Sequence, residues 1–154
     1  MWFSKDTFHQ MVHTGWIIDG RGGGFVIGRS HADGNIYMIQ ESKDGRFFIP
    51  GHMEGGEYIL SADAYFTAKE RLEQINGFKD DIEHISSISF TPKSRILNTH
   101  AKPYDKLLWI DTRGQFIINR RATSRHFQEI EEINHKFSGF TSCDLDVLSP
   151  KNDA

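Results

Sequence analysis

The stretch FFIPGHMEGGEYILSADAYFTAKERLEQINGF, residues 47–78, constrains the fold most, because it changes from a strand pattern to a helix pattern within a few residues. An apolar run ends in Pro50-Gly51, and the seven residues 51–57 then contain three glycines and two glutamates. Glycines are costly in conformational entropy unless the backbone has a task that requires them. We therefore expect this loop to belong to a functional site.

Length and charge limit the class of protein. The 154 residues predict one domain, 1–154, that buries a core. A net charge of −3 argues against long nucleic acid as a partner, whereas a small phosphorylated ligand needs only local positive charge. No apolar run approaches the ~18 residues of a membrane span, and the start lacks a signal-peptide pattern. The single cysteine, Cys143, fits a reducing cytoplasm and is read as incidental.

Local patterns predict an α+β domain with a mixed sheet between helices. Turn signals at Asp33-Gly34 and Asp44-Gly45 predict that strands 35–40 and 46–49 are antiparallel neighbours. Apolar spacing predicts a short helix at about 4–13, capped by Ser4 or Asp6, and a frayed tail at about 149–154. Further helices are expected at 61–75 and 124–137. One or two short strands broken by glycine are expected within 15–30, and further short strands at 84–92, 107–111 and 112–118.

The helix after the loop carries a row of oxygen-bearing side chains. Glu70, Glu73 and Gln74 stand at i, i+3 and i+4, so they share one helical face. Carboxylate and amide oxygens on a rigid helix suit Mg²⁺ or Mn²⁺. Glu57 and the uncovered carbonyl of Gly51 are further ligand candidates. The alternative is an ordinary solvated helix face whose charge is offset by neighbouring basic residues.

The segment FFIPGHMEGGE resembles the strand and loop of Nudix hydrolases. In that family an aromatic strand runs into Pro-Gly, and the signature opens with Gly, any five residues and Glu, as Gly51 and Glu57 do here. The segment KERLEQINGF resembles the end of the same signature. There Lys69 stands where the family has Arg, Glu70 and Glu73 take two acidic positions, and Gln74 replaces the third.

This sequence departs from the family pattern in spacing. Eleven residues rather than seven separate Glu57 from Lys69, and one extra residue precedes Gly77. A register anchored on Gly77 without a gap would place Arg71, Gln74 and Ile75 at the acidic positions and remove most of the carboxylates. We favour the gapped register, because it keeps the carboxylate face and requires an insertion of only about one helical turn.

The resemblance implies a Nudix-like α/β/α sandwich that hydrolyses a nucleoside diphosphate linked to another moiety. A nucleotide sugar, ADP-ribose or a dinucleoside polyphosphate would be the substrate, with Mg²⁺ or Mn²⁺ as cofactor. The implied metal ligands are Gly51, Glu57, Glu70, Glu73 and Gln74. A narrower likeness to the GDP-mannose branch rests on the Ser-led first helix, on ERL at 70–72 and on TSRHF at 123–127.

The groups that would act on the substrate are less constrained by the pattern. Glu73 and the loop histidine His100 are the expected catalytic groups, with His100 as the base, since its ordinary pKa lies near neutrality. His52, Arg29 and Arg46 are candidate substrate contacts, although arginines beside turns are usually solvated. The segment 119–126 gathers three arginines that suit either a phosphate or a soluble surface. The strand aromatics Trp16, Phe47, Phe48 and Trp109 are candidates to stack on a base or to form core.

Two alternatives stay open at this stage. A catalytically impaired module on the same fold would bind a nucleotide or a protein partner without turnover, which Gln74 and the altered spacing favour. An unrelated β-rich domain would carry the same glutamates merely solvated. The resemblance is also compatible with a homodimer, and the sequence leaves the oligomeric state open.

Overall fold

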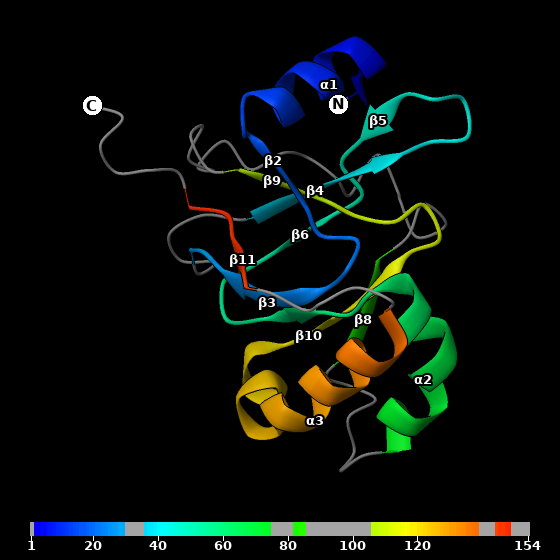
Figure 1. Cartoon of the computed structure of the whole chain (residues 1–154), viewed down its shortest axis with the longest axis vertical. Helices are drawn as coiled ribbons and strands as arrows, with labels where there is room; N and C mark the ends of the chain where they lie inside the picture. Colours follow the sequence, from blue (N-terminus) through cyan, green and yellow to red (C-terminus); the bar gives the residue numbers. More distant parts are fainter. Residues whose placement is uncertain (1, 30–35, 75–81, 86–105, 139–143, 149–154) are drawn as a thin grey trace.

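The computed structural model describes residues 2–29, 36–74, 82–85, 106–138 and 144–148. Within these ranges the chain has mixed α+β content, with three helices and two mixed sheets. Figure 1 shows the layers in order: helix α1, the first sheet, the second sheet, and then helices α2 and α3 side by side. Among the described residues, no helix combines the length and apolar character needed to cross a membrane.

The first sheet lies next to α1 and has the strand order β1-β5-β4-β9-β2, with β6 also paired to β4. Strand β9 is parallel to both β4 and β2, and the other pairs are antiparallel. The sheet is therefore mixed. Its strands are β1 (Trp2–Phe3), β2 (Ile17–Asp19), β4 (Ile36–Glu41), β5 (Phe47–Phe48), β6 (His52–Met53) and β9 (Leu107–Trp109).

The second sheet has the order β11-β3-β7-β10-β8. Only the pair β11–β3 is parallel among its described pairs. Its strands are β3 (Gly24–Ile27), β7 (Tyr58–Ile59), β8 (Ile82–Ile85), β10 (Gln115–Ile118) and β11 (Leu145–Asp146).

Helix α1 (Lys5–His13) confirms the expected N-terminal helix. Ser4 is its N-cap, because its hydroxyl oxygen accepts a hydrogen bond from the backbone N–H of Thr7 at 3.1 Å. Phe8 fixes the helix on the first sheet by stacking on Phe47 with ring centroids 3.7 Å apart. Phe47 and Phe48 are both buried, so these two aromatics belong to the core.

Helix α2 (Ala62–Gln74) also forms where the sequence predicts it. Ser61 caps it by accepting a hydrogen bond from the backbone N–H of Ala64 at 3.1 Å. Helix α3 (Arg120–Ser138) begins four residues earlier than expected, after Asn119 accepts a bond from the N–H of Ala122 at 2.9 Å. A kink at His126 (φ −125°, ψ 26°) divides this helix.

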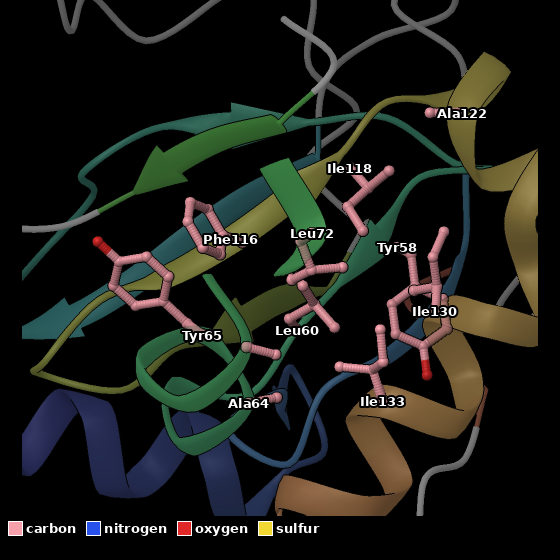
Figure 2. Packing of buried hydrophobic residues seen from close by; sticks show 11 residues of the cluster. Tyr58, Leu60, Ala64, Tyr65, Leu72, Phe116, Ile118, Ala122, Ile130 and Ile133 are labelled. Atoms are coloured by element: carbon pink, nitrogen blue, oxygen red, sulfur yellow. The ribbon is translucent and has the colours of Figure 1, made fainter. Parts of the chain in front are cut away.

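The chain builds two sheets rather than the single one expected, because β7 and β10 are apolar on both faces. Tyr58, Phe116 and Ile118 face the helices and join the core with α2 and α3, as Figure 2 shows. Ile59 and Ile117 face the other way, into a second core between the sheets. Side chains of a strand alternate between its faces, so each of these short strands serves two cores.

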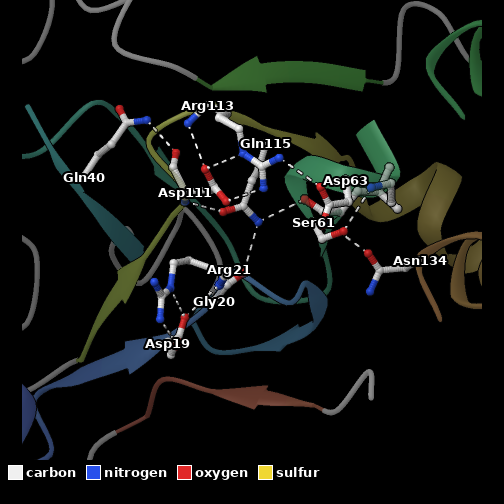
Figure 3. Close-up of polar contacts among 12 residues, drawn as sticks. Asp19, Gly20, Arg21, Gln40, Ser61, Asp63, Asp111, Arg113, Gln115 and Asn134 are labelled. Atoms are coloured by element: carbon white, nitrogen blue, oxygen red, sulfur yellow. Dashed lines mark hydrogen bonds and ion pairs between the residues drawn. The ribbon is translucent and has the colours of Figure 1, made fainter. Parts of the chain in front are cut away.

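Gln115 ties the two sheets together at the centre of a polar network (Figure 3). Its amide nitrogen donates to the carbonyls of Gly20 and Leu60, each at 3.0 Å, and its amide oxygen accepts from the N–H of Asp111 at 2.7 Å. Gln40 donates to the carbonyl of Asp111 at 2.8 Å. Because Gln115 is fully buried, these bonds fix the approach of the sheets.

Turn signals identified some elements and missed others. The Asp44-Gly45 turn is confirmed, since Gly45 has φ +83° and donates to the carbonyl of Ser42, and β4 and β5 pair antiparallel as expected. Part of the strand expected at 84–92 appears as β8, and residues 86–92 lie outside the described ranges, as do Asp33-Gly34 and the tail. The two-residue strands β1, β6, β7 and β11 were not predicted.

Candidate functional site

The glycines of the loop between β6 and β7 are explained by close packing against β3 and α3. A Cβ placed on Gly55 would lie 2.1 Å from the carbonyl oxygen of Gly28, so only glycine fits there. Gly56 has φ +90°, and a Cβ on it would lie 2.9 Å from Nε of Arg120. The N–H groups of Gly55 and Gly56 donate to the carbonyls of Arg29 and Val26, each at 2.8 Å. The loop is thereby held rigidly beside β3.

Glu57 completes this loop. Its Oε1 accepts a hydrogen bond from the backbone N–H of Glu54 at 2.7 Å, and its backbone carbonyl accepts from the N–H of Val26 at 3.0 Å. The side chain is half-buried. Glu57 therefore orders the turn from which the chain enters β7 and then α2.

Gly51 directly precedes β6 of the first sheet. The residue is buried, and its carbonyl accepts a hydrogen bond from the N–H of Met38 in β4 at 3.1 Å. A carbonyl oxygen has two lone pairs, so this bond leaves one for another partner. The sequence suggested an uncovered carbonyl. In the structure this carbonyl instead accepts a hydrogen bond from the sheet.

The helix carboxylates lie in a different layer. Glu70 is exposed on α2, and α2 covers the outer face of the second sheet, whereas Gly51 lies beside β4 of the first sheet. Glu73 and Gln74 form the last residues of α2, and their side chains lie outside the described part of the chain. No group of three or more His, Cys, Asp or Glu residues that could hold a metal occurs among the residues described.

The three expected substrate contacts stand on different segments of the chain. His52 is exposed on β6, with its ring edge-on to Tyr37 at 6.1 Å between centroids. Arg29 is half-buried after β3. Arg46 forms an ion pair with Asp44 at 2.8 Å and lies over the ring of Trp2 at 4.4 Å, on the first sheet. His100 lies outside the described residues, as does Cys143.

The aromatics expected to stack on a base are mostly structural. Phe47 and Phe48 are core residues, and Trp16 is half-buried. The guanidinium carbon of Arg21 lies 3.6 Å from the ring centroid of Trp109 and covers that ring. Within the described chain, the face of Trp109 contacted by Arg21 is thus occupied by the protein itself.

Two lowered carboxyl pKa values, those of Asp19 and Asp111, lie at the junction of the two sheets. The side-chain hydrogen bonds from Arg21 hold the pKa of Asp19 below its ordinary value of 3.8. Burial raises the pKa of Asp111, but the hydrogen bonds from Arg113 outweigh it, so that the pKa is also lowered. Arg113 further donates to Asp63 at 2.9 Å. Paired in this way, the carboxylates serve stability rather than acid–base chemistry.

A cavity of about 620 Å³ opens between β3, the loop before β7 and the first turns of α3. Its lining includes Gly56, the two basic residues Arg120 and Arg121, and the acidic residue Asp144. Its volume lies in the range of small-molecule sites. The arginine cluster at 119–126 was the sequence signal for this site, but nothing in the sequence paired it with β3.

Phe25 and Phe127 supply the apolar wall of the cavity. Their rings meet edge-to-face at 5.6 Å, and Phe127 meets Tyr58 edge-to-face at 6.1 Å. The hydroxyl of Tyr58 is within hydrogen-bonding distance of Glu131 Oε2, at 2.8 Å. Neither phenylalanine was singled out for ligand binding from sequence, because each follows the apolar spacing of its own strand or helix.

Comparison of the chain with models of protein families, with curated proteins and with solved structures finds no match.

Proposed function

We propose that the protein is a Nudix-type hydrolase that cleaves a nucleoside diphosphate linked to another moiety. The observation that supports it is the order strand, glycine loop, helix: β5 and Pro50-Gly51 lead through the loop ending at Glu57 into α2, which carries Glu70 and Glu73. The family signature needs this order. The substrate would be a nucleotide sugar such as GDP-mannose, ADP-ribose or a dinucleoside polyphosphate.

Mg²⁺ or Mn²⁺ is the proposed cofactor, with Glu57, Glu70 and Glu73 as its carboxylate ligands. When bound, a divalent cation neutralises pyrophosphate oxygens and stabilises the leaving group. Gly51 and Gln74 would be weaker ligands, since the Gly51 carbonyl already accepts a sheet hydrogen bond and Gln74 carries no charge. A cytoplasmic location belongs to the same proposal and rests on the single cysteine.

Residues of this chain would bind the substrate and take a proton from the attacking water. His100 is the proposed base that takes a proton from the attacking water, because imidazole titrates near neutral pH. Lys69 would steady Glu57 by a charge-assisted bond, as the family arginine does.

The test is turnover by purified protein with Mg²⁺ or Mn²⁺ on GDP-mannose, ADP-ribose and a dinucleoside polyphosphate, with products separated by chromatography. Glu70→Gln and Glu73→Gln should each lower kcat at least about tenfold, the effect of losing a ligand that stabilises developing charge. Glu132→Gln, an exposed carboxylate on α3, is the matched control and should leave the rate unchanged. Absence of turnover on the whole panel would remove the proposal.

A second candidate is a binding module on the same fold without catalysis. The specific observation in its favour is the hydrogen bond from the Met38 N–H to the Gly51 carbonyl, which commits one expected ligand to the sheet. Calorimetry with GDP-mannose, run with Mg²⁺ and with EDTA, separates the two candidates. Equal affinity in both buffers, without product, favours the module.

A further inference from the structure

The cavity between β3 and α3 carries more positive than negative charge. Two of its lining residues, Arg120 and Arg121, are basic, and one, Asp144, is acidic. A surplus of positive charge in a concave site favours an anion. The planar guanidinium fork matches phosphate oxygens better than a point charge does.

One of these arginines is held in place by the loop. The side chain of Arg120 lies against the backbone of Gly56, where a Cβ would lie 2.9 Å from Nε and 3.3 Å from Cγ. Arg120 therefore lies beside the turn that borders the cavity. The exposed hydroxyl of Ser124 adds a further donor to the lining of the cavity.

The apolar wall of the cavity offers an aromatic contact rather than a charged one. Phe127 is 36% exposed although it is supported edge-on by Phe25 and Tyr58. An aromatic ring that packs against two other rings and is partly exposed offers a surface for contact with a planar base. Asp144 can accept a hydrogen bond from a ribose hydroxyl or a base N–H.

We propose that this cavity binds a nucleoside phosphate, with Arg120 and Arg121 on the phosphate and Phe127 on the base. The proposal rests on the cavity alone and needs no hydrolysis, so it holds or fails separately from the proposed function. It excludes a long polynucleotide, because the chain carries a net charge of −3.

The experiment is isothermal titration calorimetry of the full chain in EDTA, with GMP, AMP, guanosine and inorganic phosphate as separate ligands. We expect GMP and AMP to bind at least about tenfold more tightly than guanosine, because guanosine lacks the phosphate that would make the charged contacts. They should also bind more tightly than inorganic phosphate, which has no base to stack on Phe127.

Variants locate the binding. Arg120→Gln and Arg121→Gln should each weaken GMP at least about fivefold, and Phe127→Leu should weaken GMP but not inorganic phosphate. Arg125→Gln is the matched control, since it removes an equal charge from an exposed arginine of α3 outside the cavity wall. Thermal unfolding of each variant checks that the fold is kept.

Three outcomes would overturn the proposal. The first is no binding of either monophosphate by the wild-type chain at millimolar concentration. The second is equal affinity for GMP and guanosine, or for GMP and inorganic phosphate, since one half of the site would then be inactive. The third is an equal loss in Arg120→Gln and Arg125→Gln, which would indicate general surface charge.

Discussion

The side chain of Arg120 packs directly on the backbone of Gly56, so a residue at the start of α3 depends on a glycine of the loop before β7. A Cβ at Gly56 would lie within 3.5 Å of three Arg120 atoms, Nε, Cγ and Cδ. Gly56 also has φ +90°, a conformation that side-chain-bearing residues rarely adopt. Loop and helix are therefore coupled through one contact.

This contact predicts that Gly56→Ala destabilises the chain for two separate reasons. Backbone strain at positive φ costs about 1 kcal/mol, and displacement of Arg120 adds about 1 kcal/mol more. Urea unfolding followed by circular dichroism measures the sum.

Gly45→Ala is the matched control for that substitution, because Gly45 has φ +83° with open space where a Cβ would point. It should show the strain alone. Arg120→Ala made together with Gly56→Ala should recover the extra loss. Equal losses in Gly45→Ala and Gly56→Ala would show that the Arg120 contact has no energetic weight.

Burial of Gln115 leads to a second prediction. Gln115→Met keeps the side-chain volume but leaves the carbonyls of Gly20 and Leu60 and the N–H of Asp111 without this partner. We expect a loss of about 2–4 kcal/mol in the free energy of unfolding, because a buried polar group left unsatisfied costs about 1–3 kcal/mol.

The control is Gln128→Met on the exposed side of α3, which should change stability by less than about 0.5 kcal/mol. A Gln115→Met protein as stable as the wild type would mean that water replaces the amide in the network.

Local signals predicted the elements well where one pattern acts alone. The Ser4 cap with Phe8, and the Ser61 cap with the apolar face of α2, define their helices from sequence. The division into two sheets was not predictable in this way, because it depends on β7 and β10 being apolar on both faces. Two-residue strands such as Tyr58–Ile59 are too short for any periodicity to show.

The candidate site was also only partly predictable from sequence. The glycine loop was predicted to have a task, and its glycines do meet a requirement, the close approach to Gly28 and Arg120. The cavity joins Phe25 to Arg120 and Phe127, residues about a hundred positions apart in the chain. Sequence spacing carries no information about such a contact; only the pairing of β3 with β7 and the packing of α3 bring them together.

The pairs Asp19–Arg21 and Asp111–Arg113 predict how stability changes in acid. Both carboxyl pKa values are lowered from 3.8 in the folded chain, so the folded state favours the ionised form. The stabilisation is therefore complete above pH 3.8 and is lost as the pH falls through the lowered values.

Thermal unfolding between pH 2 and pH 6 should show the midpoint falling on the acid side, and Asp111→Asn should make that fall shallower. An unchanged pH profile in Asp111→Asn would contradict this assignment. Because Arg113 is half exposed, we expect its pair to contribute less than about 1 kcal/mol.

Asn134 carries the last prediction, because it joins α3 to two other segments. Its Oδ1 accepts from the N–H of Ser61 at 2.8 Å, and its Nδ2 donates to the carbonyl of Gly22 at 3.0 Å. The residue is fully buried. Asn134→Asp replaces that donor by an oxygen facing the Gly22 carbonyl, so the new carboxyl must be protonated to fit. Burial then raises its folded pKa above the unfolded value of about 3.9.

A group whose charged form is disfavoured by folding destabilises increasingly as the pH rises above its unfolded pKa. Asn134→Asp should therefore be closest to the wild type near pH 4 and lose at least about 2 kcal/mol of unfolding free energy by pH 7. Asn134→Ala, which cannot titrate, should lose a similar amount at both pH values relative to wild type. Urea unfolding of the three proteins at pH 4 and pH 7 makes the comparison. A pH-independent loss in Asn134→Asp equal to that in Asn134→Ala would mean that the new carboxylate reaches water, and that the contact with Gly22 is not enclosed.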